Sequence, residues 1–328
     1  MSDPFLSPDA EPVPETDWRG TKALSPLQEE MRDVLKTRGP SPGHVLADAM
    51  PDVSPIALWR ACYTSRRFRI QNCARYYLRY DILRGNQLRL SPSILRDFLT
   101  FSLVYLPEQH ISVVEAGTRM ANKFRAISLR KLGRARQALL RLPRELQDEI
   151  NAHCVVFLSG DIAYYLAHDT PRQHPQTRTP LHGSDIDIVI VTNREADRTK
   201  IARIEAELLI TKKVFLLTPN IREEIDFIVK PVERMLDQLA YVDIHDKIAS
   251  KILYESYFLM GRTDIYDSLI RNMDMRGTRS RIEADFETAL RERQQTIRKI
   301  RDLPPEASVE DPEVASLFFA SQERLEFR

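Results

Sequence analysis

The spacing of apolar residues predicts a group of helices in the first part of the chain. From residue 27, apolar side chains recur on one helical face, and the segment stops at a glycine, a usual helix end (Leu27, Met31, Val34, Leu35 and then Gly39). A short helix over 43–50 ends before Pro51, and a third begins at Ser54-Pro55, where serine suits the N-cap and proline the first turn. Two β-capable stretches around Gly85-Asn86 then predict a hairpin. Three helices and a hairpin are the outline of a winged helix-turn-helix.

A different pattern starts at Cys154, where short apolar runs alternate with helical stretches. The residues before it, 94–150, are mostly of helical character and dense in leucine and arginine. The pattern after it predicts strands over 154–158, 185–192, 213–217 and 223–230, helices over 161–168 and 196–209, and a helical portion from about Val232. Strands that alternate with helices in this way indicate an α/β or α+β core.

The predicted fold class is therefore α+β, in which an α/β-type core follows a mostly helical, winged-helix-like module. We place a flexible tail rich in proline and acid at 1–24, the winged-helix-like module at 25–95, a helical connector at 96–150, the core at 151–232 and a helical carboxy-terminal region at 233–328.

Composition bounds the class of protein. With 43% hydrophobic and 29% charged residues, the 328-residue chain is globular in character, and its net charge of +1 gives no overall sign of a nucleic-acid partner. Three separated cysteines suit a reducing compartment better than a disulfide framework (Cys62, Cys73 and Cys154). Since no apolar run approaches the ~20 residues of a membrane span and no signal peptide is apparent, we expect a cytoplasmic protein without a membrane partner.

The candidate chemistry centres on two aspartates in the segment 183–191. On a strand, residues two apart share a face, so Asp185 and Asp187 project together while Ile186 and Ile188 fill the other side. Paired carboxylates are hard-oxygen ligands that suit Mg²⁺, and without a cation they would repel each other. The alternative is a surface strand that happens to carry two acids.

Two further features strengthen the metal hypothesis. Ser159-Gly160 forms a small-residue turn before a predicted helix, where free backbone N–H groups can hold a phosphate. Asp226 is an isolated acid on a later strand, and a third carboxylate would complete a two-metal site. An ordinary strand-to-helix turn and an exposed strand acid are the alternatives.

Together these motifs resemble the polymerase-β-like nucleotidyltransferase superfamily, which shows a Gly/Ser turn, an aspartate pair on a strand and a later lone aspartate. The segment 246–270 (DKIASKILYESYFLMGRTDIYDSLI) further resembles the AbiEii/MenT family, which comprises toxins of toxin–antitoxin and phage-defence systems. Lys251 falls at that family's helical lysine, and Asp264 and Asp267, after Arg262, fall on its DxxD. The resemblance covers roughly residues 153–272.

The resemblance implies a nucleoside monophosphate transfer from an NTP to an acceptor hydroxyl, first of all a tRNA 3′ end, by a toxin or phage-defence effector with an antitoxin partner. It implies Mg²⁺, with Mn²⁺ as the alternative ion, on Asp185, Asp187 and Asp226. The NTP would be bound by Ser159, Gly160, Ser184 and Lys251, and Asp264 and Asp267 would line the same site. A lysine beside the triphosphate would offset charge that develops during transfer.

The chain departs from the family pattern in its phosphate turn. The order is Ser-Gly, Asp161 follows where a small hydroxyl residue is usual, and the interval between Gly160 and Asp185 is long. These departures leave open an altered donor or acceptor. The inserted loop carries four residues that could contact a nucleotide or an RNA end, but its histidine spacing matches no standard zinc site (Arg172, His174, Arg178 and His182).

An excess of arginine marks the amino-terminal module. Residues 56–90 hold eight arginines, no lysine and a single acid, Asp81 (the arginines are 60, 66, 67, 69, 75, 79, 84 and 89). Interleaved aromatic residues, most of which we expect in the core, complete a pattern that favours DNA or structured RNA such as tRNA as a partner. The third helix, with Arg60, Arg66, Arg67 and Arg69, would be the groove-reading element. An acidic partner or an interdomain face is the alternative for these arginines.

Three other functions compete with RNA modification. A nucleic-acid-binding regulator with a vestigial transferase core would explain Asp161 in the phosphate turn. Transfer to a protein hydroxyl (AMPylation) and modification of a small molecule such as an antibiotic would use the same chemistry on another acceptor. The antibiotic-modifying hypothesis leaves the arginine-rich module unexplained.

Overall fold

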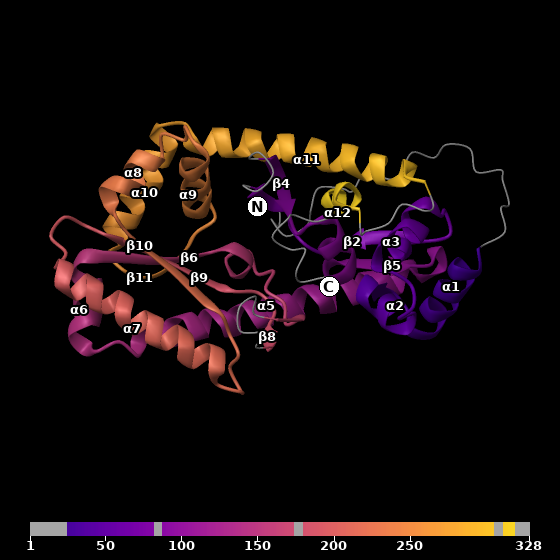
Figure 1. The fold of residues 1–328 in the computed structure, drawn as a ribbon, viewed down its shortest axis with the longest axis horizontal. Coiled ribbons are helices and arrows are strands. Elements are labelled where there is room, and N and C mark those ends of the chain that lie inside the picture. Colours follow the sequence, from indigo (N-terminus) through magenta and orange to yellow (C-terminus); the bar gives the residue numbers. More distant parts are fainter. Residues whose placement is uncertain (1–24, 82–86, 174–179, 305–310, 319–328) are drawn as a thin grey trace. The chain divides into compact units, whose positions relative to one another are not determined.

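The computed structural model describes residues 25–81, 87–173, 180–304 and 311–318. The fold is α+β with mixed sheets, and it divides into two compact units (Figure 1). Unit 1 takes its described residues from 1–77, 89–123 and 289–327, and unit 2 from 78–88 and 124–288. Neither unit is one continuous stretch, whereas the domains predicted from the sequence follow one another along the chain.

Unit 1 begins with the three predicted helices, which are confirmed. They are α1 (Pro26–Arg38), α2 (Gly43–Ala49) and α3 (Pro55–Thr64). Ser25 and Gln28 form a capping box at the start of α1, and the Ser54 side chain accepts a hydrogen bond from the backbone N–H of Ala57 at the start of α3. The cap at Ser54 is the one predicted from the sequence, whereas α1 was predicted from its apolar spacing.

An antiparallel sheet accompanies these helices in unit 1. Its order is β1-β5-β2, formed by β1 (Ser41–Pro42), β2 (Arg69–Asn72) and β5 (Ser102–Tyr105). The predicted hairpin strands exist as a separate pair, β3 (Tyr77–Asp81) with β4 (Gln87–Ser91), while its turn at Gly85-Asn86 lies outside the described residues. β5 lies within the segment 96–150, which was expected to be a mostly helical connector, and its buried Leu103 and Val104 pair with β1 and β2.

The core of unit 1 absorbs the aromatic residues of the arginine-rich segment, as expected. Trp59 is fully buried, stacks on Tyr63 and meets the ring of Phe318 edge-on. Phe318 belongs to α12 (Pro312–Phe318), and the end of α11 (Thr278–Asp302) packs beside it. The remaining short elements are α4 (Ile94–Arg96), the π-helix η2 (Asp97–Phe101) and the 3₁₀ helix η3 (Pro107–Gln109).

Unit 2 is built on a four-stranded sheet in the order β10-β9-β6-β11. Its strands are β6 (Cys154–Ser159), β9 (Ile186–Thr192), β10 (Ile225–Pro231) and β11 (Tyr257–Gly261). β9 and β10 run parallel, while β6 is antiparallel to both β9 and β11. The first three strands confirm predictions, and β11 interrupts the carboxy-terminal region that was expected to be helical.

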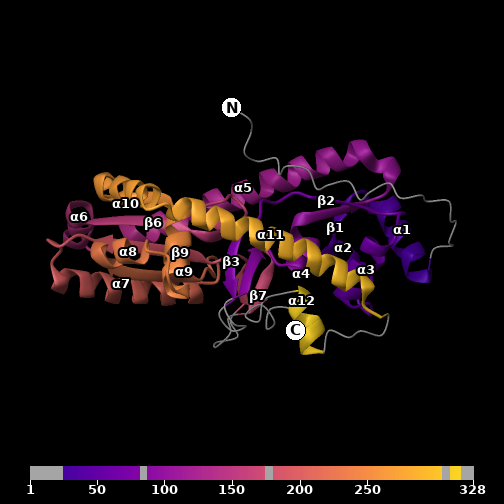
Figure 2. The ribbon, with the colours of Figure 1, turned by 90° about the horizontal axis from the view of Figure 1, so that it is seen from above.

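Helices cover both faces of this sheet (Figure 1). On one face Ile186, Ile188 and Ile190 pack with residues of α5 (His110–Leu140), α6 (Arg144–His153) and α7 (Arg198–Leu217). On the other face Val189 and Val191 pack with α8 (Val232–Gln238), α9 (Ile244–Tyr254) and α10 (Thr263–Met275), which lie toward the viewer in Figure 2. A sheet buried on both faces explains the nearly continuous apolar runs of its central strands.

Two predicted elements of the core are wrong. The segment 161–168 is no α-helix but the short 3₁₀ turn η4 (Gly160–Ile162) followed by turns, in which Tyr165 has a φ of 58°. The segment 213–217 is the end of α7 instead of a strand. Asp197 caps that helix, and Ile204, Leu208 and Phe215 bury one side of it against the sheet, so packing overrides the β preference of a short apolar run.

The two remaining strands, β7 (Pro171–Gln173) and β8 (Pro180–His182), form a small antiparallel pair within the long interval between Gly160 and Asp185. His174 and Arg178 lie between them, outside the described residues. Throughout the described ranges, none of the helices has the length and apolar character that a membrane crossing requires.

Candidate active site

Three predicted site residues lie side by side on neighbouring strands. In the sheet register Ser159 of β6 is the partner of Asp187 of β9, and Asp187 is the partner of Asp226 of β10. Neighbouring strands are about 4.8 Å apart, so the serine and the two carboxylates form one row across the sheet. Asp187 has the same strand parity as Val189 and Val191, which places it on the face covered by α8, α9 and α10.

Gly160 brings the backbone of the turn against the Asp187 carboxylate. Its φ of +75° lies in the left-handed region, and a Cβ atom at this position would come within 3.1 Å of Asp187 Oδ2. The glycine therefore serves two needs, a backbone conformation that other residues adopt with strain and space for the carboxylate. Any larger residue here would press on the centre of the row.

The carboxyl group of Asp187 is strongly perturbed. Its pKa is raised from 3.8 to about 7, chiefly by burial and then by the nearby charges of Asp226, Asp161 and Glu255, while Lys251 acts in the opposite direction. Several acids thus crowd one carboxylate that is itself half-buried. Such crowding is the electrostatic situation that a divalent cation relieves.

Lys251 and Glu255 add a second layer above the row. Both come from the end of α9, and the Lys251 ammonium lies 2.6 Å from Glu255 Oε1. The same oxygen accepts a hydrogen bond from the backbone N–H of Gly160 at 3.2 Å. The side chains are 14% and 1% exposed, and burial raises the pKa of Glu255. Lys251 was predicted from the sequence as a site residue and Glu255 was not, although the spacing of four residues between them is a recognisable pairing signal on a helix.

Asp226 has a cationic partner that the sequence analysis also missed. Lys212 of α7 forms an ion pair with its carboxylate, and the Asp226 side chain is 50% exposed. This half of the row is therefore open to solvent, in contrast to the buried end at Glu255.

Ser184 and Asp161 are bound to each other. The Ser184 hydroxyl donates to Asp161 Oδ2 at 2.7 Å and accepts from the backbone N–H of His168 at 3.2 Å. The loop that precedes Asp185 is also anchored at His182, whose carbonyl accepts a hydrogen bond from the buried Lys131 ammonium at 2.7 Å. Ser184 thus holds two loops of the site together, and its hydroxyl is already engaged.

The predicted metal ligands Asp185, Asp187 and Asp226 are not gathered into a three-ligand group in the part of the chain that the structure describes. Among the described residues, no three histidine, cysteine, aspartate or glutamate side chains are arranged to hold a metal ion. Asp185 lies just before β9 begins, and Asp226 pairs with Lys212. The remaining neighbours Asp187 and Asp226 still fit Mg²⁺, because this ion commonly takes one or two carboxylates and completes its shell with water and substrate phosphates.

Asp264 and Asp267 do not join this row. The backbone N–H of Arg262 bonds to the Cys154 carbonyl, and Gly261 pairs with Val155, so α10 starts at the opposite end of β6 from Ser159. That separation is about 13 Å of strand at ~3.3 Å per residue. Asp264 is 61% exposed and accepts a hydrogen bond from Arg262 Nε at 2.7 Å, and Asp267 is exposed too. This placement corrects the expectation that these acids line the site. They follow Lys251 closely in the sequence, but strand β11 lies between and carries the chain to the other end of β6.

The arginines of the amino-terminal module separate into two groups. α3 ends at Thr64, so Arg66, Arg67 and Arg69 lie beyond the predicted groove-reading helix, and all three are exposed. Arg60 is on the helix, but its guanidinium donates to the carbonyls of Leu303 and Pro304, the latter at 2.8 Å, at the end of α11. Arg60 therefore caps a helix, and the exposed group consists of the three later arginines.

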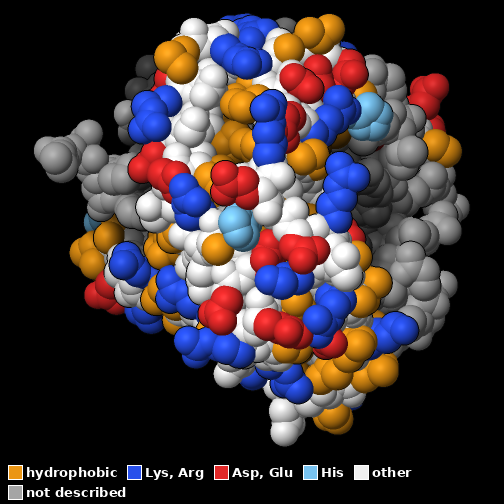
Figure 3. Space-filling model, turned by 90° about the vertical axis from the view of Figure 1, so that its left-hand side faces the viewer, with side chains coloured by type: hydrophobic (Ala, Val, Ile, Leu, Met, Phe, Trp, Pro, Cys, Tyr) orange, Lys and Arg blue, Asp and Glu red, His pale blue; other side chains and the backbone are white. Residues whose placement is uncertain are grey.

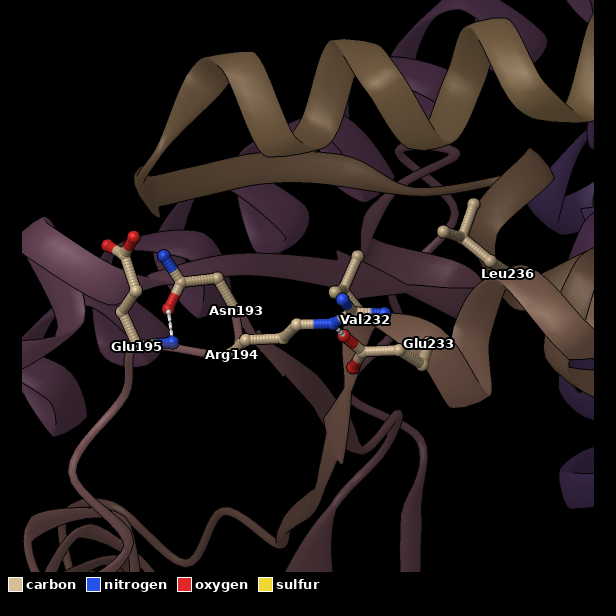
Figure 4. A pocket seen from close by; sticks show the side chains of 6 residues that line it. All are labelled: Asn193, Arg194, Glu195, Val232, Glu233 and Leu236. Carbon is tan, nitrogen blue, oxygen red and sulfur yellow. Dashed lines mark hydrogen bonds and ion pairs between the residues drawn. The ribbon is translucent and has the colours of Figure 1, made fainter.

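A shallow pocket of about 380 Å³ opens at the other end of β9 and β10. Figure 4 shows the side chains that line it, among them the ion pair between Arg194 and Glu233 (the others are Asn193, Glu195, Val232 and Leu236). Since Asp187 and Asp226 lie at the start of these strands, this pocket is separate from the acidic row. On the face of unit 2 drawn in Figure 3, basic and acidic side chains are interspersed.

No family model matches the chain, and comparison with curated proteins and with solved structures found no match.

Proposed function

We propose that the chain is a Mg²⁺-dependent nucleotidyltransferase that moves a nucleoside monophosphate from an NTP to an acceptor hydroxyl. The observation that carries the proposal is the row of Ser159, Asp187 and Asp226 across three adjacent strands, with Lys251 beside it. In a nucleotidyltransferase of the polymerase-β-like kind, the serine–glycine turn, the aspartate strand and the later aspartate must meet around one nucleotide. The strand order β10-β9-β6 supports the proposal, because it makes the strands that carry these motifs direct neighbours.

The residues of the candidate site would divide the parts of the reaction between them. Asp187 and Asp226 would hold the metal ion, which when bound supplies positive charge to the triphosphate. Lys251 would neutralise phosphate oxygens, and Gly160 lets the backbone approach them without a side chain between. The acceptor oxygen forms a bond to the α-phosphorus, and the bond between the α-phosphorus and the oxygen that bridges it to the β-phosphorus breaks. Pyrophosphate leaves with the electron pair of that bond, and the hydroxyl proton passes to water.

An RNA acceptor, with a tRNA 3′ end as the first candidate, is part of the proposal. In a winged helix, a strand between the first two helices joins a strand pair that follows the third helix, and the order β1-β5-β2 in unit 1 has this form. β2 and β5, rather than the predicted hairpin β3–β4, would then be the wing strands. The exposed Arg66, Arg67 and Arg69 at the start of β2 would contact phosphates of the nucleic acid. The role as a toxin or phage-defence effector with an antitoxin rests on the sequence resemblance.

The test is transfer of label from each of the four NTPs to total tRNA in the presence of Mg²⁺. We expect incorporation by the wild type, loss of at least about 100-fold in D187N and D226N, and no change in D264N, which removes an exposed acid at the other end of β6. Label that persists in D187N would refute the mechanism. Label found on protein or on a small-molecule acceptor instead of tRNA would support nucleotidyl transfer but refute RNA as the acceptor.

The alternative with a specific observation in its favour is a nucleic-acid-binding regulator whose transferase core is vestigial. Gly160 N–H and Lys251, two groups that would meet a triphosphate, are both engaged by Glu255, and Asp161 adds negative charge beside them. A regulator would bind nucleic acid through unit 1 and would show no NTP binding in calorimetry. Detection of NTP binding that requires Lys251 would exclude it.

A further inference from the structure

Two hydrogen-bond donors of the candidate site converge on a single oxygen atom. The Lys251 ammonium and the Gly160 backbone N–H both point at Glu255 Oε1, at 2.6 Å and 3.2 Å. One oxyanion held by an ammonium and a backbone amide is the geometry with which proteins bind phosphate oxygens. Here a carboxylate of the chain itself occupies that place.

The surroundings of Glu255 disfavour a permanent charge at this position. Its side chain is 1% exposed, and its second oxygen, Oε2, has no hydrogen-bond partner within the described part of the chain. Glu255 is also the C-cap residue of α9, where the helix dipole places negative charge, and Asp161 lies close enough to act on it electrostatically. A buried carboxylate with one oxygen unsatisfied and like charges nearby weakens the folded state.

We propose that Glu255 is an internal competitor for the triphosphate: its carboxylate fills the phosphate position formed by Lys251 and Gly160, and nucleotide binds only as this carboxylate withdraws. The inference rests on the proposed function, because it assigns a triphosphate to these two donors. It makes Glu255 a determinant of nucleotide affinity, whereas Lys251 and Gly160 remain the groups that touch the ligand. Glu255 is the C-cap residue of α9 and precedes β11, so it belongs to none of the strands of the sheet.

A simple positioning role for Glu255 predicts the opposite behaviour. If Glu255 only holds Lys251 in place, its neutralisation misplaces the lysine, and anion binding becomes weaker. If it competes, glutamine at this position removes the rival charge and leaves an amide oxygen of the same shape, so anion binding becomes stronger. The sign of the change in affinity therefore decides between the two roles.

The experiment is isothermal titration of the full chain with inorganic tripolyphosphate, without added metal. We expect E255Q to bind about 10-fold or more tightly than the wild type, which corresponds to about 1.4 kcal/mol, and we expect E255Q combined with K251M to lose this gain. The matched control is E149Q, because Glu149 is also buried and also pairs with a lysine, Lys200, and a backbone N–H, that of Asp197, away from the site. It should bind as the wild type does.

Equal or weaker binding by E255Q would overturn the proposal. If E255Q fails to fold, as judged by circular dichroism, E255D provides the same comparison, because a side chain shorter by one methylene draws the carboxylate back from Gly160. The outcome is separable from that of the proposed function. A gain in tripolyphosphate affinity without nucleotide transfer to any acceptor would refute the proposed transferase function and support the role of Glu255 as a competitor. Nucleotide transfer that depends on Asp187, combined with no gain in the affinity of E255Q, would support the transferase function and refute the role of Glu255 as a competitor.

Discussion

Neutralising Asp187 should stabilise the protein, and the gain should grow with pH. In the unfolded chain this carboxyl group ionises near 3.8, whereas in the folded state its pKa is about 7 because it is buried and faces Asp226, Asp161 and Glu255. Between these two values the folded protein holds a proton that the unfolded chain has released. Rising pH therefore favours the unfolded state through this group, which is the reverse of the usual behaviour of a paired aspartate. D187N removes the titrating group and keeps its shape.

The magnitude follows from the width of this window. Each unit of pKa difference corresponds to about 1.4 kcal/mol, so a shift from 3.8 to about 7 amounts to about 4 kcal/mol once the pH lies above the window. Because Asp187 is partly reached by solvent, screening reduces this figure, and we expect about 2–4 kcal/mol. Near pH 4 wild type and D187N should have nearly the same free energy of unfolding, and near pH 8 D187N should exceed the wild type by that amount.

The assay is urea-induced unfolding of both proteins, followed by circular dichroism in steps of pH from about 4 to about 8. Working with the difference between the two proteins cancels the titration of the other acids. D264N is the matched control, because Arg262 lowers the pKa of that exposed carboxyl, and its removal brings no gain as pH rises. Addition of Mg²⁺ near pH 8 should stabilise the wild type and leave D187N unchanged, since a cation bound by the folded state alone adds to stability.

A difference between D187N and wild type that stays constant with pH would refute the reasoning. So would a gain that appears at low pH and disappears at high pH, because this would mean that the Asp187 carboxylate is stabilised by its neighbours in the folded state. Either result would remove the acidic row as a place prepared for a cation, whatever the result of the transfer assay.

Two further predictions concern the turn and the arginine group. G160A should lose about 1 kcal/mol of stability, because its φ is +75°, and should reduce nucleotide transfer at least about 10-fold, because the new Cβ would press on Asp187. G39A is the control, since Gly39 has a φ of +77° and nothing within 4 Å. In urea unfolding and in the transfer assay, G39A should lose similar stability and keep full activity. Replacing Arg66, Arg67 and Arg69 together by alanine should weaken tRNA binding, measured by fluorescence anisotropy over a salt series, and lower the steepness of log K against log salt by about 2–3. R60A should instead lower the melting temperature, because Arg60 caps α11. An unchanged salt slope in the triple variant would place the nucleic-acid surface elsewhere.

Local sequence signals were sufficient for the elements whose stability is local. Helix α3 starts at the predicted Ser54-Pro55 cap, and α1 starts one residue before the predicted Leu27, as the structure confirms. The central strands β6 and β9 also follow from their continuous apolar runs, since a strand buried on both faces needs apolar side chains at nearly every position. The edge strand β10, which is mostly half-buried, follows instead from the apolar residues that alternate around Asp226. The aspartates on these strands could therefore be chosen as candidates from the sequence.

The errors arise where packing overrides a local preference. The run 213–217 reads as a strand in isolation but continues α7, because its Phe215 buries against the sheet at helical spacing with Leu208 and Ile204. The segment after Gly160 reads as a helix, yet it turns at Tyr165 to bring His168 against Ser184. Neither outcome depends on the residues of the segment alone.

The sequence by itself was enough to choose Ser159, Asp187 and Asp226 as candidates and to predict the strands that hold them, because alternation and apolar runs act over a few neighbouring positions. The tertiary structure alone decided which of them meet. Strand register set Ser159, Asp187 and Asp226 in one row, and helix packing brought Lys251, Glu255 and Lys212 to it. The same packing left Asp264 at the far end of β6. Register and helix placement depend on contacts between segments far apart along the chain, and no short pattern of residues encodes them.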